Sequence, residues 1–111
     1  MFTTLFLPDA TAEEIDWFNE LQRLSTSPEN AVRLQRAFAE IDVRDMLAKV
    51  VVLTLLLHPR DDCVVPFALG RELAATISGA QFVPLESRNH RVLENEPAWR
   101  RAIDCIREFL A

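Results

Sequence analysis

The chain has 111 residues, half of them hydrophobic, and a formal net charge of −5 at pH 7. This length allows one domain with a modest core. An acidic chain offers no basic surface for a phosphate backbone, so we expect no direct nucleic-acid binding. The longest apolar run, residues 50–57, is too short to cross a bilayer, and the only glycines, Gly70 and Gly79, exclude the usual glycine-rich nucleotide loops.

The two cysteines, Cys63 and Cys105, are isolated and form no CxxC pattern, which argues against a zinc site. No secretory signal is recognisable at the N-terminus. The sequence therefore predicts reduced thiols in a cytoplasmic protein. We expect no metal and no cofactor.

The first part of the chain predicts helices. Residues 1–8 are too apolar for a free tail and are expected to pack against another surface. Residues 11–14, Thr-Ala-Glu-Glu, form a capping box that starts the first long helix. Ser27 as a cap and Pro28 in the first helical position start the second. Asp42 is expected to cap a short third helix.

The hydrophobic period changes after residue 48. Residues 50–57 are apolar on both faces, which is typical of a strand covered on both sides in a parallel sheet. A helix follows and ends at Ser78-Gly79. Residues 81–86 predict a second strand, which Pro84 places near an edge or a bulge. A last helix runs from about Pro97, with an apolar stripe formed by Trp99, Ala102, Ile103, Ile106, Phe109 and Leu110.

The predicted order is therefore three helices, strand, helix, strand, helix, which is an α/β class. The strand–helix–strand unit requires a right-handed parallel crossover. Two strands alone make a poor sheet, and an unpaired apolar edge invites another chain. We expect a homodimer that completes the sheet through the exposed edge of residues 50–57.

Polar side chains follow each predicted strand. Asp61 and Asp62 come directly after the first, and His90 comes shortly after the second. Sites in open α/β sheets form beyond the carboxyl ends of the strands. An aspartate that orients a histidine, which then acts as a general base, is the logic of a catalytic triad. The alternatives are a solvated turn, since aspartate favours turns, an exposed loop histidine, or a metal site that adds His58 in a spacing typical of no metal.

Four segments together suggest a family. They are Leu-Thr-Leu-Leu-Leu-His at 53–58, Asp-Cys-Val-Val-Pro at 62–66, Gly-Arg-Glu-Leu-Ala at 70–74, and Gly-Ala-Gln-Phe-Val-Pro-Leu at 79–85 leading into Asn89-His90. With them the chain resembles the C-terminal part of the α/β-hydrolase superfamily, and is similar to hydrolase domains joined to LuxR-type transcriptional regulators. The resemblance covers residues 40–111 well. It implies one partial domain, in which residues 1–48 are cap-proximal helices and residues 49–111 form the C-terminal strand–helix–strand–helix segment.

The resemblance implies roles for two residues. Asp62 stands three residues before Val65 of the Val-Pro pair, as the triad acid does in that family, and His90 corresponds to the triad histidine. Asp61 is then a spacer. The chain departs from the family pattern at Leu53, Pro59 and Asn89, and none of these departures removes a triad group.

The third member of a triad is not in these residues. None of the serines, Ser25, Ser27, Ser78 and Ser87, lies in a Gly-x-Ser-x-Gly elbow. Cys63 is a weak substitute, because a neighbouring carboxylate raises the pKa of a thiol. Two hypotheses follow: the C-terminal segment of a serine hydrolase that is inactive alone, or a non-catalytic module for dimerisation or ligand sensing associated with transcriptional regulation.

Overall fold

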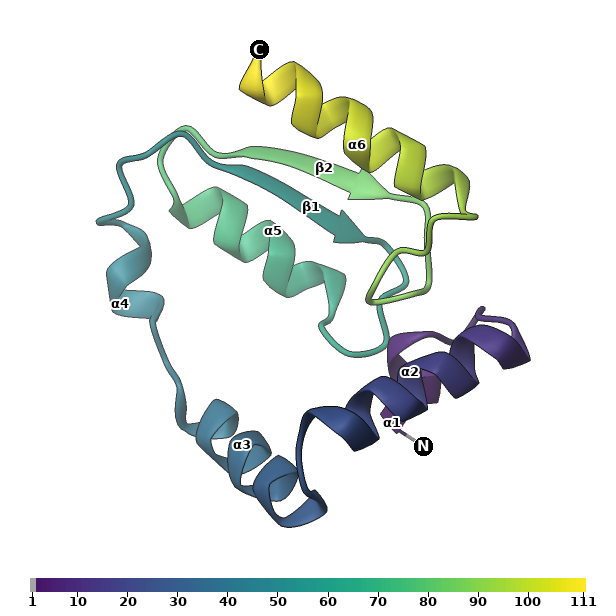
Figure 1. Ribbon diagram of the computed structural model, residues 1–111. Helices are drawn as coiled ribbons and strands as arrows, with labels where there is room; N and C mark the ends of the chain where they lie inside the picture. Colours follow the sequence, from purple (N-terminus) through teal and green to yellow (C-terminus); the bar gives the residue numbers. More distant parts are fainter. Residues whose placement is uncertain (1) are drawn as a thin grey trace.

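The structure, a computed structural model, describes residues 2–111 (Figure 1). In this part of the chain there are six helices and two strands. The elements are α1 (Phe2–Phe6), α2 (Ala12–Ser25), α3 (Pro28–Glu40), α4 (Arg44–Leu47), β1 (Leu55–Pro59), α5 (Phe67–Thr76), β2 (Gln81–Leu85) and α6 (Pro97–Leu110). The two parallel strands and the flanking helices are compatible with a partial α/β fold, with one helix more than expected because residues 2–6 are helical.

The second strand lies where the sequence predicts it, but the first does not. β1 pairs with β2 in parallel from Leu55 opposite Gln81 to Pro59 opposite Leu85. The prediction of a strand over residues 50–57 is therefore wrong at both ends. Because β2 begins only at Gln81, residues 50–53 have no strand opposite them. Their apolar side chains Val51, Val52 and Leu53 are 91%, 68% and 85% exposed.

In each strand, some main-chain N–H and C=O groups bond to the other strand, and the rest face the open edge of the sheet. The amide of Gln81 donates to the carbonyl of Thr54, and the amide of Arg60 donates to the carbonyl of Leu85. Alternate residues of a parallel strand bond to the same neighbour, so the even-numbered residues of β1 face β2. The residues of β1 whose main chain faces the open edge are Leu55, Leu57 and Pro59.

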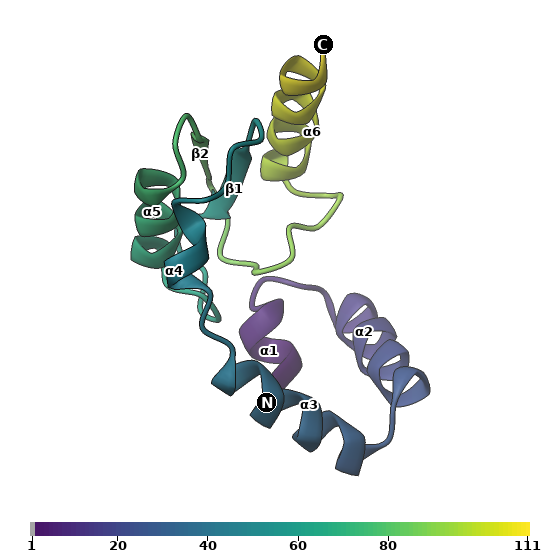
Figure 2. The same ribbon diagram turned by 90° about the vertical axis from the view of Figure 1, so that its left-hand side faces the viewer.

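The sheet is covered by one helix on each side, as the edge-on view in Figure 2 shows for α5 and α6. The core lies between β2 and α6, where Leu85, Ala98 and Ala102 are buried and Leu57, Val83 and Val92 pack against them. The predicted stripe of α6 is only partly right. The buried face is Ala98, Ala102 and Cys105, while Trp99, Ile106 and Leu110 are exposed.

The first three helices form an N-terminal arm (α1, α2 and α3), in which α1 and α2 lie beyond the carboxyl ends of the strands and α3 leads back toward α4 (Figure 1). The predicted packing of the N-terminal segment holds for Thr3 and Leu7, which are buried, but Phe2 and Leu5 are exposed, and Met1 lies outside the described residues. The capping box is also present: the Thr11 hydroxyl accepts from the Glu14 amide, and the Glu14 carboxylate accepts from the Thr11 amide. Ser27 caps α3 as expected. Neither α2 nor α3 contains a buried residue.

The remaining helix ends differ only in detail from the prediction. Asp42 accepts a hydrogen bond from the amide of Arg44, but the N-cap residue of α4 is Val43. α5 ends at Thr76, just before Gly79 turns the chain with a φ of 72°. Among residues 2–111 no helix has the length and apolar character needed to span a membrane.

Candidate functional site

Two loops meet at the carboxyl ends of the strands. The turn that holds Asp61 and Asp62 follows β1, and the loop that holds His90 follows β2. A main-chain bond from the Asp61 amide to the Ser87 carbonyl, 3.2 Å long, joins them. Neighbouring parallel strands thus place side chains 28 residues apart within contact distance.

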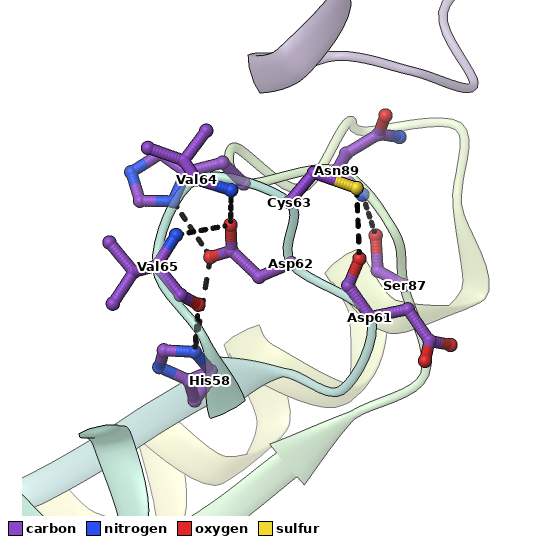
Figure 3. A network of polar contacts seen from close by, with 9 residues as sticks. His58, Asp61, Asp62, Cys63, Val64, Val65, Ser87 and Asn89 are labelled. Carbon is purple, nitrogen blue, oxygen red and sulfur yellow. Dashed lines mark hydrogen bonds and ion pairs between the residues drawn. The ribbon is translucent and has the colours of Figure 1, made fainter. Parts of the chain in front are cut away.

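Asp62 is the centre of the site (Figure 3). Its side chain is 1% exposed. One carboxylate oxygen, Oδ1, accepts hydrogen bonds from the amides of Val64 and Val65 at 2.8 and 3.0 Å. The other, Oδ2, lies 2.7 Å from Nδ1 of His90. This arrangement fixes the carboxylate through the turn and leaves one oxygen for the histidine.

The environment of Asp62 favours its charged form. Burial is the largest influence and by itself raises the pKa of the carboxyl group. The hydrogen bonds from the Val65 amide, from His90 and from the Val64 amide, together with the charge of His90, outweigh it, and the pKa lies below its usual value. A buried anion that is hydrogen-bonded on both oxygens is a suitable partner for an imidazolium.

His90 is held by its main chain as well as by its ring. Its amide donates to the carbonyl of Phe6 at 2.8 Å. The ring of Phe6 packs edge-to-face on the imidazole, with 4.9 Å between ring centroids. The His90 side chain is 33% exposed. With Nδ1 directed at Asp62, the other ring nitrogen, Nε2, is the one that can exchange a proton with a further group.

Asp61 differs from its neighbour. Its carboxylate points away from that of Asp62 in Figure 3, and the residue is exposed. Its carbonyl faces the thiol of Cys63 at 3.6 Å. The structure therefore brings Asp62 and His90 together and keeps the Asp61 side chain out of the contact.

Asn89, the residue before His90, helps to fix the loop that carries His90. Asn89 is fully buried. The side-chain oxygen Oδ1 of Asn89 accepts a hydrogen bond from the main-chain amide of Asp9 at 3.0 Å. The main-chain amide of Asn89 donates to Ser87 Oγ, also at 3.0 Å. Ser87 in turn donates to Glu96 at 2.7 Å. Asn89 Nδ2 is buried without a hydrogen-bond partner within the described residues.

Residues of the N-terminal arm and its connections also contact the loop that carries His90. Arg88 pairs with Asp9 at 2.6 Å, and the guanidinium of Arg91 lies 5.1 Å from the centre of the Trp17 ring. With the Phe6 and Asn89 contacts, these interactions attach residues 88–91 to α1, α2 and their connection. The conformation of the His90 loop thus depends on residues more than seventy positions earlier.

Sequence reasoning missed most of these supporting residues. The Val64 and Val65 amides could have been inferred, because aspartate commonly accepts hydrogen bonds from amides two or three residues later in a turn. The contacts of Phe6 and Asp9 carry no local signal in the sequence. For metals, no group of three or more His, Cys, Asp or Glu side chains with suitable geometry occurs in residues 2–111.

Comparison with known proteins supports an α/β-hydrolase-like region. The chain is 32% identical over 80 residues to the "AB hydrolase superfamily protein YisY" of Bacillus subtilis (strain 168). The aligned region covers 72% of this chain but 30% of that protein. The chain thus spans less than a third of the length of the curated relative that it matches. No protein-family model matches the chain.

Proposed function

We propose that these residues are the C-terminal segment of an α/β-hydrolase-like protein, with Asp62 as the triad acid and His90 as the triad histidine. The segment is one partial domain, in which the helices of residues 1–48 adjoin the strand–helix–strand–helix unit of residues 49–111. The 2.7 Å contact between Asp62 Oδ2 and His90 Nδ1, made by a buried carboxylate at the carboxyl ends of two parallel strands, carries this proposal.

The chemistry follows from this contact. Asp62 holds the imidazole with Nδ1 protonated, so that Nε2 has a free lone pair. Nε2 then takes the proton of a serine hydroxyl as the oxygen attacks an acyl carbon, and Asp62 stabilises the imidazolium that forms. The proton passes to the leaving group when the tetrahedral intermediate collapses. The serine and the oxyanion-binding amides must come from residues outside these 111, so we expect no acyl hydrolysis by this chain alone.

Ester hydrolysis tests the proposal in two forms of the protein. The purified chain should not hydrolyse p-nitrophenyl butyrate above a buffer blank. A longer polypeptide from the same gene, if the DNA upstream of Met1 encodes an in-phase Gly-x-Ser-x-Gly segment, should hydrolyse it. There, His90→Ala should abolish turnover and Asp62→Asn should lower kcat by about 10⁴-fold. Asp61→Asn is the matched control and should change kcat little. Equal effects of the two Asp→Asn substitutions would contradict the assignment.

A second function is favoured by a different observation, the open edge of β1 next to the exposed apolar residues 51–53. In this proposal the segment is a non-catalytic module for dimerisation or small-molecule sensing, associated with a LuxR-type regulator. Unpaired strand edges beside apolar side chains recruit other chains. A gene without an upstream nucleophile segment would favour this module, and an upstream Gly-x-Ser-x-Gly would favour the hydrolase.

A further inference from the structure

Near the proposed triad there is a second histidine, His58 of β1, which has no role in the triad mechanism. His58 is largely buried, with its side chain 13% exposed. Its Nε2 lies 3.0 Å from the carbonyl oxygen of Val65 and 3.9 Å from Asp62 Oδ2. The second distance is too long for a hydrogen bond. His58 therefore contacts the turn that holds Asp62, and does not bond to the carboxylate itself.

We propose that His58 is a positioning residue that fixes Asp62 through the main chain of Val65. This inference rests on the proposed function, in which Asp62 is the triad acid. The Val65 carbonyl accepts from His58, and the Val65 amide donates to Asp62 Oδ1. A single residue of the turn thus joins the strand-end histidine to the carboxylate that faces His90.

The direction of the first bond defines the state of the ring. A carbonyl oxygen can only accept, so Nε2 of His58 carries the proton in this contact. Nδ1 faces Gly70. His58 therefore donates from Nε2, whereas His90 needs its proton on Nδ1 to donate to Asp62. The two histidines on either side of Asp62 thus donate through different ring nitrogens.

The ring of His58 is fixed by its neighbours. A Cβ atom added to Gly70 would lie 2.7 Å from His58 Nδ1 and 2.9 Å from Cγ, too close for real atoms. On another side the Phe67 ring packs edge-to-face, with centroids 5.7 Å apart. Gly70 is buried in α5, so the helix that covers the sheet also sets the position of the ring. The missing side chain of Gly70 provides the space for His58.

Solution NMR of this chain tests the positioning role without any measurement of activity. The readout is the carboxyl ¹³C titration of Asp62, together with the hydrogen-bonded Nδ1 proton of His90. His58→Phe keeps a flat ring but removes the donor, so the Asp62 pKa should rise toward its usual value and the His90 proton signal should be lost. His58→Gln keeps an N–H donor, and should restore the low Asp62 pKa.

Two glycine substitutions form a matched pair. Gly70→Ala should displace the His58 ring and raise the Asp62 pKa as His58→Phe does. Gly79→Ala, at a positive φ with open space around it, should lower the melting temperature without moving the Asp62 titration. An unchanged Asp62 titration in folded His58→Phe or Gly70→Ala protein would overturn the role.

The wild-type chain gives an answer even if these variants do not fold. Imidazole ¹⁵N shifts distinguish the tautomers, and the proposal requires His58 protonated at Nε2 at neutral pH. A His58 ring without a proton on Nε2, the Nδ1–H tautomer, would overturn it. These outcomes are separate from the ester test above, which concerns only Asp62, His90 and the supplied serine.

Discussion

At the scale of single residues, the site depends on how a buried carboxylate is kept charged. Among the described residues, the contacts of Asp62 include no lysine or arginine. Two main-chain amides and one imidazole stabilise the charge instead. Hydrogen bonds from a turn follow the direction of the main chain, so they hold the carboxylate in one orientation as well as in one charge state.

The lowered pKa of Asp62 predicts a pH dependence of stability. Since the folded pKa is below the unfolded one, the carboxylate stabilises the fold above the unfolded pKa, and this contribution is lost as pH falls through the folded pKa. Asp62→Asn should cost about 2 kcal/mol in the free energy of unfolding at pH 7. Urea unfolding of both proteins should show the difference shrinking below about pH 4.

The matched control for this measurement is Asp61→Asn, because Asp61 is exposed and directed away from the contact. Its free energy of unfolding should stay within about 0.5 kcal/mol of wild type at every pH. A difference between wild type and Asp62→Asn that persists unchanged at pH 3 would contradict the role of the Asp62 charge.

Asp62, His90 and Asn89 show how much of the site the sequence predicts. The Asp61-Asp62 pair and His90 could be chosen in advance, because they follow two apolar strands and parallel strands end at the same edge of a sheet. The choice of Asp62 over Asp61 comes only from the resemblance to the α/β-hydrolase superfamily. Asn89 could not be chosen in advance. Its burial comes from Asp9 and Ser87, contacts that only the folded chain creates.

At the scale of elements, the error in the first strand has a physical cause. Val50, Val51 and Val52 have a high intrinsic preference for strands, but a strand exists only where a neighbour bonds to it. The partner starts at Gln81, so the ladder starts at Leu55. The capping box and Ser27 were predictable because their hydrogen bonds are local. The strand limits were not, because they are set by a distant segment.

α6 gives a prediction about packing. Its buried face is made of small residues, and Ala102 packs in the core with Leu85. Ala102→Leu adds volume to a close-packed site and should destabilise the fold by about 1–3 kcal/mol. Leu110→Ala, on the 76% exposed end of the helix, should change stability by less than about 0.5 kcal/mol. Thermal unfolding followed by circular dichroism would measure both. Equal losses would mean that the larger apolar residues form the buried face.

At the scale of the whole molecule, the sheet formed by residues 2–111 has two strands, and exposed apolar residues precede one of them. We predict that two copies pair through β1 and the residues before it, with a solution mass twice the 12.7 kDa of one chain. Light scattering at concentrations well above micromolar measures this mass. Val51→Lys with Leu53→Lys should give monomers, because a charged edge resists pairing.

The control is Leu24→Lys with Val32→Lys, which places the same charges on exposed apolar positions of α2 and α3 instead. This variant should remain dimeric. A wild-type monomer at these concentrations would contradict the pairing, and a dimer lost only in the control variant would move the interface to the N-terminal arm.

The place of Pro84 limits what such pairing can build. The odd-numbered residues of β2 bond to β1, so Pro84 lies with its main chain toward the outer edge, where a proline has no N–H to donate. A two-fold pair through β1 would have a proline at each of its two outer borders. On the β1 edge the only proline, Pro59, is the last residue of the strand, so the residues before it can still pair, whereas Pro84 lies within β2. Further strand addition at the outer borders is disfavoured, and we expect a closed pair instead of a filament that grows from both ends.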